Sequence, residues 1–206
     1  MTLEIWLAFA AASAVLLAIP GPTVLLVVSY ALGHGRGSGW ATVPGVTLGD
    51  FTAMTVSLLG AGAVLAASAD LFSALKIAGA AYLVYLGIRL WRAPTGPIQA
   101  TAQHGRETQW RMFANAYVVT ALNPKSIVFF VAFLPHFVDL TQPALPQFIV
   151  LETTFLALAA INVTLWALLA GQMRRQFQQP ATVRLLNRIG SGLLIGAAAL
   201  TAAIRQ

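Results

Sequence analysis

The chain has 206 residues, of which 58% are hydrophobic and only 9% are charged, and its mean hydropathy is +0.78. Soluble domains carry about 25% charged residues, so this composition excludes an ordinary soluble domain and indicates an integral membrane protein. The absence of cysteine excludes disulfides, thiolate catalysis and cysteine-ligated metals.

Six apolar stretches are long enough to cross a bilayer, which takes about 20 residues. They run from about Leu3 to Leu32, Trp40 to Ala67, Leu71 to Leu90, Met112 to Phe137, Gln147 to Gly171 and Leu185 to Ile204. The first stretch lacks the basic start of a signal peptide and is longer than one, so we expect a retained helix. The sequence therefore predicts an all-α membrane protein with six transmembrane helices in a single membrane domain, residues 1–206.

Pro20-Gly21-Pro22 lies deep inside the first stretch, where it must interrupt the helix. Each proline removes a backbone donor and clashes with the preceding turn. In hydrocarbon the freed carbonyls have no water to bind, so a break is tolerated only when it is buried in protein or lines a wet cavity. A structural kink is the alternative, but a second break in the fourth stretch favours a substrate site between two broken helices.

That second break is Asn123-Pro124-Lys125. The two halves of a broken helix expose opposite ends of the helix dipole, which can bind an anionic or zwitterionic substrate. Lys125 is the only lysine deep in a predicted span, and it could neutralise Asp50, hold a substrate carboxylate or cap the broken helix. Snorkelling to the membrane surface is the alternative, although the central position of Lys125 makes it awkward.

Asp50 lies ten residues into the second stretch. A charge at the middle of a bilayer costs roughly 2.5–3.5 kcal/mol on insertion scales, so such a residue usually serves a transport pathway or a proton relay. We expect Asp50 to carry the coupled proton or to bind a substrate ammonium. The alternative is a structural, hydrogen-bonded acid.

Glu152 lies about two turns into the fifth stretch and could serve the pathway or lie at the interface. Asn123 and Asn162 are plausible polar contacts for a substrate. For Asn162 a hydrogen bond between helices, worth roughly 0.6 kcal/mol, is the better interpretation.

Two small-residue motifs, Gly45-xxx-Gly49 and Gly192-xxx-Gly196, predict close helix packing rather than a site. Such glycine faces could also pair two copies of the chain as a homodimer.

Positive charge gathers in alternate connectors and sets the expected orientation. Nine arginines lie in or near the first, third and fifth connectors, whereas only Lys76 and Arg205 lie on the other side. The positive-inside rule therefore places these three connectors in the cytoplasm and both termini outside. This placement also explains the net charge of +6 without nucleic acid as a partner.

The two halves of the chain look related. A shift of 102 positions places Pro22 on Pro124 and Asp50 on Glu152. Three helices per copy is an odd number, so the second copy must be inverted in the membrane. We expect a first repeat over residues 1–92, a cytoplasmic linker over 93–111 and a second repeat over 112–206, although chance matches between apolar sequences are the alternative.

No cofactor is indicated. The three histidines lie in connectors or at the ends of spans, without the spacing of a metal or haem site, and there is no Walker loop for ATP. An intramembrane enzyme would require a catalytic dyad or metal cluster in the spans, so we expect no enzyme.

Four motifs resemble the LysE/RhtB family of amino acid exporters. They are Ala18-Ile-Pro-Gly-Pro-Thr23, Gly45 to Asp50, Lys76-Ile-Ala-Gly-Ala-Ala-Tyr-Leu-Val-Tyr-Leu-Gly87, and Leu122-Asn-Pro-Lys-Ser126 followed by Phe130-Val-Ala-Phe-Leu-Pro-His-Phe137. The resemblance covers the full length. His136 departs from the glutamine that the family often has there, and the fifth and sixth stretches match weakly.

The resemblance implies export of an amino acid or a close relative, driven by the proton motive force, across the cytoplasmic (inner) membrane of a bacterium. The leading hypothesis places the substrate carboxylate at the broken-helix amides near Gly21 and Asn123, with Lys125 assisting. Asp50 would take the substrate ammonium or the proton. A passive channel or a non-transporting assembly subunit is the alternative.

Overall fold

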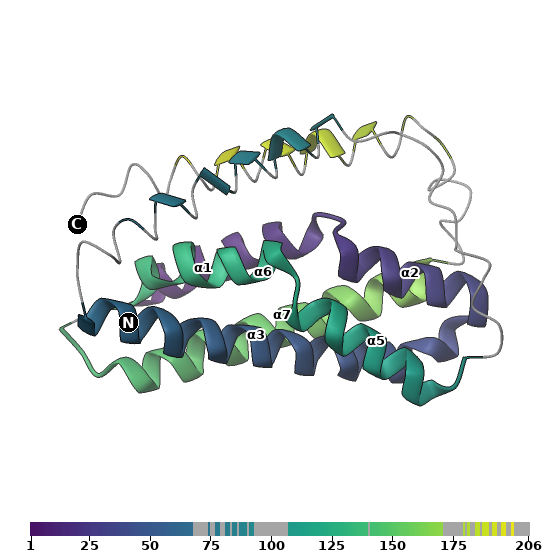
Figure 1. Ribbon diagram of the computed structural model, residues 1–206, viewed down its shortest axis with the longest axis horizontal. Coiled ribbons are helices and arrows are strands. Elements are labelled where there is room, and N and C mark those ends of the chain that lie inside the picture. The colour runs from purple at the N-terminus through teal and green to yellow at the C-terminus, as the bar shows by residue number, and fades with distance from the viewer. Residues whose placement is uncertain are drawn as a thin grey trace.

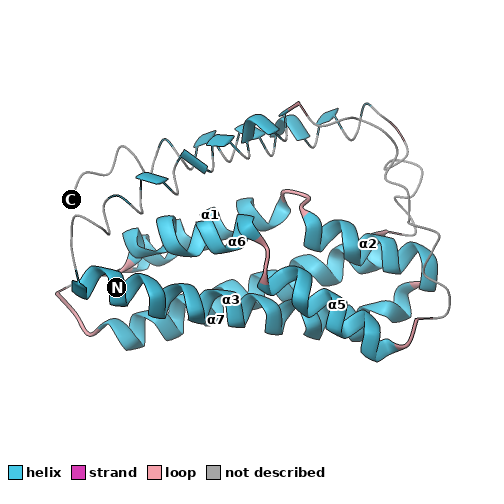
Figure 2. Cartoon of the chain, in the orientation of Figure 1, coloured by secondary structure: helices cyan, strands magenta, loops and turns pink. Residues whose placement is uncertain are grey.

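The computed structural model describes residues 1–67, 107–139 and 141–170, with scattered positions from 74 to 92 and from 179 to 199 (Figure 1). Within these residues every regular element is a helix and none is a strand, in agreement with the predicted all-α class (Figure 2). The labelled helices run roughly along the long axis of the molecule, and both helix breaks lie near its middle (Figure 1).

The described elements follow the predicted stretches closely. They are α1 (Leu3–Ala18), α2 (Pro22–His34), the 3₁₀ turn η1 (Arg36–Ser38), α3 (Gly39–Ala67), α5 (Gln109–Ala121), α6 (Pro124–Val128), η2 (Phe129–Phe133), η3 (Leu134–Phe137) and α7 (Ala144–Leu169). The fourth stretch is thus broken at Asn123 and then passes through a π turn, η2, and a 3₁₀ turn, η3.

The predicted break in the first stretch is present. α1 ends at Ala18 and α2 begins at Pro22, with a bend of 54° between them. Pro22 is the first residue of α2, where its missing N–H would have no helical partner in any case. Gly21 precedes it in an extended conformation.

The second break has the same design. Pro124 is the first residue of α6, and Asn123 stands before it as the capping residue. The Asn123 side chain accepts a hydrogen bond from the Lys125 amide, which a helix start otherwise leaves unsatisfied. Pro22 and Pro124, which a shift of 102 positions superimposes, therefore occupy the same position in their helices.

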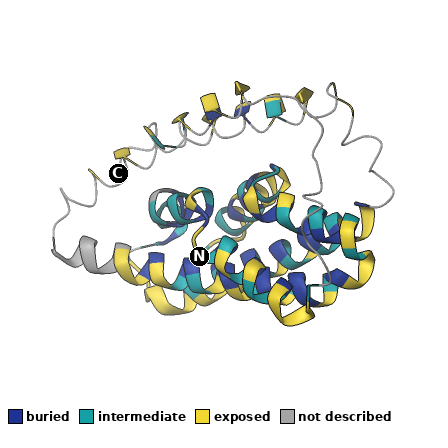
Figure 3. Ribbon diagram, turned by 45° about the vertical axis from the view of Figure 1, so that its right-hand side comes forward, coloured by how far each residue is buried: buried dark blue, intermediate teal, exposed yellow. Residues whose placement is uncertain are grey.

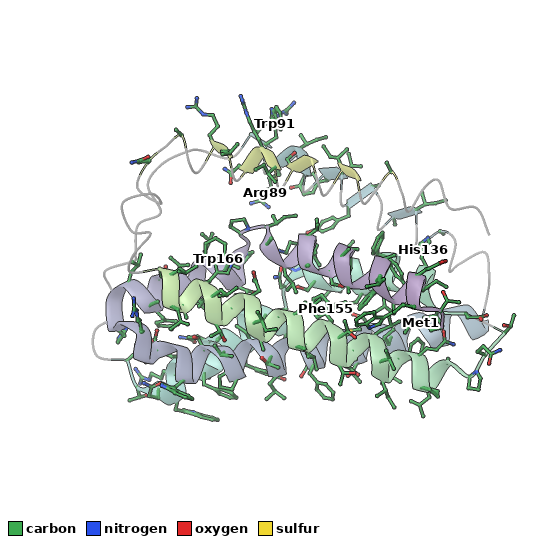
Figure 4. All side chains as sticks on the ribbon, turned by 180° about the vertical axis from the view of Figure 1, so that it is seen from behind. Met1, Arg89, Trp91, His136, Phe155 and Trp166 are labelled. Atoms are coloured by element: carbon green, nitrogen blue, oxygen red, sulfur yellow. The ribbon has the colours of Figure 1, made fainter. Side chains whose placement is uncertain are left out.

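An aromatic cluster fills the space between α1, α3, α7 and the turns η2 and η3. The rings of Phe130 and Phe155 meet edge to face at 4.8 Å, and Phe129 and Phe133 lie 5.0 Å apart. Phe155 points inward from α7, and Phe9 joins the cluster from α1 (Figure 4). This packing holds α1 and η3 against α3 and α7.

A glycine face brings α3 and α5 into close contact, as the Gly45-xxx-Gly49 motif predicts. A Cβ atom at Gly45 would lie 2.5 Å from the Phe113 carbonyl oxygen, and one at Gly49 would lie 2.8 Å from the Tyr117 carbonyl oxygen. For the other motif, a Cβ at Gly192 or Gly196 would meet no described atom within 4 Å, so the structure gives no support to close packing there.

The long helices turn buried residues toward one another and exposed residues outward (Figure 3), and many of the exposed residues are large and hydrophobic. Val56, Leu59 and Ile161 are all more than half exposed. Among the described helices, α7 is long and apolar enough to cross a membrane, and α1 with α2 passes the same test as one bent span. The predicted count of six spans goes beyond what these helices establish.

About half of the positions in the third and sixth stretches, including Lys76, lie outside the described residues. At the described positions the two stretches touch. The Arg188 guanidinium lies 5.2 Å from the centre of the Trp91 ring, and a Cβ at Gly87 would lie 2.8 Å from Ile195. The third and sixth stretches are therefore neighbours in space at these points.

The loop before α7 is organised by Asp139 and Gln147. The Gln147 amide group bonds both the Asp139 N–H and the Asp139 carbonyl, each at 2.9 Å. The Thr141 hydroxyl and amide both donate to the Asp139 carboxylate, and these bonds hold its pKa below the ordinary value.

The α3–α5 contact leads to a stability prediction. Gly49→Ala should lower the melting temperature of the detergent-solubilised protein, because the added methyl meets backbone atoms of α5, and overpacking typically costs about 1–3 kcal/mol. Gly60→Ala is the matched control, since no described atom lies within 4 Å of its added methyl. Equal melting temperatures for the two variants would contradict this packing.

Candidate functional site

A narrow pocket lies where the two helix breaks meet. Its walls come from the end of α1, the start of α2, and from α3, α6 and α7. They consist of Leu16, Leu17, Gly21, Thr23, Val24, Val46, Asp50, Asn123, Lys125, Ser126, Asn162 and Val163. Its enclosed space is about the size of one water molecule, so the conformation is a nearly closed one.

Lys125 caps the carbonyl end of α1. Its ammonium donates to the carbonyl oxygens of Leu16, at 3.1 Å, and Ile19, at 3.0 Å. The end of a helix carries roughly half a negative charge, so a cation is favoured at this place. Of the roles that the sequence left open for Lys125, capping of the broken helix is therefore the one present in this conformation.

Gly21 makes this contact sterically possible. A Cβ atom at Gly21 would lie 3.3 Å from the Lys125 nitrogen and 3.5 Å from its Cε. The first distance is tighter than ordinary van der Waals contact, so a side chain there would push the ammonium away. The glycine between the two prolines thus has a packing role beyond freedom of the backbone.

Asn162 supplies a second cap for the same helix end. Its side-chain amide, on α7, donates to the Leu17 carbonyl at 3.1 Å. This is a bond between helices, as the sequence favoured, but Asn162 also lines the pocket. Leu16, Leu17 and Ile19 thus all have carbonyls bound by side chains from the second half of the chain.

A chain of polar side chains joins the two breaks on the other side of the pocket. The Asn123 amide donates to the Thr23 hydroxyl at 3.3 Å, and the Thr23 and Thr120 hydroxyls are 3.2 Å apart. All three side chains are buried. The two breaks are therefore joined by the hydrogen bond between Asn123 and Thr23 as well as by the hydrogen bonds of Lys125.

Asp50 faces the pocket from α3 with only 3% of its surface exposed. No described group donates a hydrogen bond to its carboxylate, and no carboxylate oxygen lies within 4.0 Å of the Lys125 ammonium. The two opposite charges nevertheless act on each other electrostatically. The pocket therefore holds a buried carboxylate and a buried ammonium that are separated rather than paired.

The start of α2 adds backbone donors to the same wall. The first amides of a helix have no acceptor within it, and Gly21 provides no side-chain cap. Thr23 and Val24 occupy the first turn of α2 and both line the pocket. Free amides at a helix start bind anions, so this wall suits a carboxylate.

The structure brings together four of the predicted site residues, Gly21, Asp50, Asn123 and Lys125, while Pro20, Pro22 and Pro124 shape the breaks beside them. Glu152 lies elsewhere. Its carboxylate accepts a hydrogen bond from the Thr55 hydroxyl at 2.7 Å, and it precedes Asn162 by ten residues, about 15 Å along α7.

Sequence reasoning missed several polar residues. Thr23 follows the first break directly, so its place beside Pro22 was a usable signal, whereas Thr120 and Ser126 gave none. A second polar network, around the buried Tyr30, was also missed. The Tyr30 hydroxyl donates to Glu107 at 2.7 Å and accepts from the Asn115 amide at 2.8 Å, which ties α2 to the start of α5.

His136, which departs from the resembled family, lies on η3 at the end of the bundle where Met1 also lies (Figure 4). Its Nδ1 is 3.1 Å from the Phe133 carbonyl oxygen. It is far from Trp166, which marks the other end of α7 (Figure 4). Among the described residues no three His, Asp or Glu side chains come together as metal ligands.

The cap on α6 gives a second prediction. Asn123→Ala should destabilise the protein by about 1 kcal/mol, because the Lys125 amide loses its acceptor, and lower its melting temperature in detergent. Asn123→Ser should recover much of this loss, since serine caps a helix start as well. If alanine and serine melt together below wild type, the loss comes from the Thr23 bond instead.

The chain is similar to known proteins over nearly its whole length. The model of the LysE type translocator family matches residues 14–205. The chain is 33% identical over 206 residues to a homoserine/homoserine lactone efflux protein of Salmonella typhi, covering 100% of both chains. It is 29% identical over 178 residues to a leucine efflux protein of an Enterobacter species, covering 85% of this chain and 82% of that one.

A membrane protein of Vibrio cholerae is 33% identical over 202 residues, covering 98% of each chain. No solved structure matches. The family model covers more than nine-tenths of the chain. The chain therefore belongs to the LysE type translocator family.

Proposed function

We propose that this protein exports a small amino acid, or a close relative of one, from the bacterial cytoplasm in exchange for protons. Membership of the family and relatives named as efflux proteins support amino acid efflux. The observation that carries the proposal is the pair of buried, separated charges, Asp50 and Lys125, across a pocket between two broken helices.

Such a pocket complements a zwitterion. An amino acid carries one carboxylate and one ammonium, which would meet the amides of Thr23 and Val24 and the carboxylate of Asp50. Lys125 lines the same pocket and would add an N–H donor on the carboxylate side. Asn123 and Ser126 line the same wall.

A neutral side chain is the better fit to this site. Asp50 is the acidic residue in the lining and would already meet the substrate ammonium, so a cationic side chain would have no carboxylate of its own. The relatives' names specify homoserine, homoserine lactone and leucine, none of which has a charged side chain.

The proposed architecture has six transmembrane helices in two inverted repeats, residues 1–92 and 112–206, joined by a cytoplasmic linker at 93–111. The matching positions of Pro22 and Pro124 at the starts of α2 and α6 support it. The arginines of alternate connectors favour both termini outside the inner membrane. Rocking of one repeat against the other would open the closed pocket to each side in turn.

Protons are proposed as the coupling ion, and Asp50 and Glu152 as acids that could take part. The position of Glu152 beside Thr55, outside the pocket, argues for a lesser role. A homodimer and a passive channel or assembly subunit remain alternatives that no described contact favours.

Transport itself is the first test. Proteoliposomes of the purified protein, loaded with radiolabelled leucine, homoserine or lysine, should release neutral amino acids against their gradient when a pH gradient is imposed. Collapse of the gradient with a protonophore should stop uphill efflux, because the energy source is removed. Release that only ever runs downhill would identify a channel.

Replacement of the pocket carboxylate is the second test. Asp50→Asn should weaken binding of a neutral amino acid roughly 10- to 100-fold, because a hydrogen bond to a charged group is worth about 1.5–3 kcal/mol. Coupled efflux should fall with it, while the variant still inserts and melts cooperatively. Isothermal titration calorimetry and efflux assays measure the two effects.

Glu152→Gln makes the same acid-to-amide change outside the pocket. We expect a much smaller effect on binding than for Asp50→Asn. A strong loss of coupling in Glu152→Gln with wild-type behaviour in Asp50→Asn would reverse the two assignments.

A further inference from the structure

The carbonyl end of α1 is a cation site that the protein already fills with its own ammonium. The Lys125 nitrogen lies 3.1 Å from the Leu16 oxygen and 3.0 Å from the Ile19 oxygen, and Gly21 leaves just enough room for it. These oxygens belong to a helix end inside the protein, where water is scarce. An ammonium is therefore bound much more firmly there than a neutral amine would be.

The same site lies within reach of a substrate. Leu16, Leu17 and Gly21 line the pocket together with Lys125 and Asp50. A substrate ammonium that approaches Asp50 from inside the pocket also approaches the α1 carbonyls. Two ammonium groups beside one helix end repel each other, so the site favours one cation at a time.

We propose that Lys125 carries the coupled proton. The Lys125 ammonium and the substrate ammonium occupy the α1 carbonyl site, close to Asp50, at different stages of the cycle. This inference rests on the proposed amino acid export. It identifies Lys125 as the group that releases and takes up the proton, which the proposed function alone does not do. Lys125 then competes with the substrate ammonium for the α1 carbonyls and also lies near the substrate carboxylate.

The exchange balances in protons and charge. On the cytoplasmic side the Lys125 ammonium gives one proton to water, its nitrogen becomes a neutral amine and leaves the carbonyls, and the substrate ammonium takes its place. On the outer side the substrate leaves, and the amine takes one proton from water and returns to Leu16 and Ile19. One substrate leaves the cell for each proton that enters.

The surroundings of Lys125 limit the other candidates for the proton. α3 contributes Asp50, α2 contributes Thr23, α7 contributes Asn162 and the start of α6 contributes Ser126. Asp50 is thus the titratable group that faces Lys125 from the described helices. Glu152 lies on α7 about 15 Å before Asn162, the α7 residue that lines the pocket. The test must therefore separate Lys125 from Asp50.

The sequence allows a direct measurement, because the chain has only two lysines, Lys76 and Lys125. In a Lys76→Arg protein labelled with ¹⁵N-lysine, the side-chain nitrogen signal belongs to Lys125 alone and distinguishes ammonium from amine. We expect an ammonium without substrate and an amine with saturating leucine or homoserine, with release of about one proton for each substrate bound. An ammonium that persists in the calorimetrically saturated complex would overturn the proposal.

Lys125→Arg provides a second readout. Arginine keeps its positive charge in proteins, so it can bind the carbonyls but cannot release a proton. Exchange of labelled for unlabelled substrate should be slower than in wild type and should lose its pH dependence, and uphill efflux driven by a pH gradient should disappear. Lys76→Arg, the matched control, should keep both.

Uphill efflux by Lys125→Arg would assign the proton to Asp50 or another group and sink the proposal. If Lys125→Arg does not fold, the nitrogen signal of the Lys76→Arg protein decides alone. A wild-type protein that exchanges neither leucine nor homoserine would instead refute the proposed function, which keeps the two failures distinct.

Discussion

The break between α1 and α2 sets the constraint on which the rest of the structure depends. A helix that stops inside an apolar environment leaves carbonyls with no partner, and each one costs free energy unless a donor is supplied. This protein supplies donors from α6 and α7, through Lys125 and Asn162. Because these donors come from the second half of the chain, satisfying the first break requires the second half to be in place.

The same requirement explains why the pocket has its composition. Lys125 brings a positive charge into the interior, and Asp50 offsets it from α3. The close approach of α3 and α5 at Gly45 and Gly49 brings Thr120 beside Thr23, while Asp50 lines the pocket from α3. A structural solution to a broken helix thus produces a small cavity with one acidic and one basic side chain, which suits the proposed recognition of a zwitterion.

Much of this could be predicted from the sequence, because the informative residues act locally. Proline and glycine limit the backbone wherever they occur, so both breaks and the starts of α2 and α6 followed from Pro20, Pro22 and Pro124. Asp50 could be identified because a charged residue inside an apolar stretch costs free energy. The close contact at Gly45 and Gly49 also followed from residue size alone.

The features that the sequence did not predict depend on which helices pack against each other. One sequence without relatives does not show which helices become neighbours. Lys125 reaches over 100 residues back along the chain to α1, and Asn162 does the same from α7. Glu152 matches Asp50 by position, yet the packing of α7 turns it toward Thr55 rather than the pocket. The π turn η2, Phe129 to Phe133, likewise contributes to the aromatic cluster, and no local pattern predicts it.

The lengths of α1 and α2 have an electrical consequence. Their 16 and 13 residues span about 24 and 20 Å, so neither alone crosses the roughly 30 Å of hydrocarbon, and the break between them lies well inside the membrane. A full crossing is worth about 2.3 kcal/mol per charge at 100 mV. In the proposed exchange with protons, a proton that reaches the break from outside would have passed through only part of the membrane potential, and would release the remainder on its way to the cytoplasm. The depth of Gly21 in the bilayer would then divide the voltage between two separate steps of the proposed transport cycle.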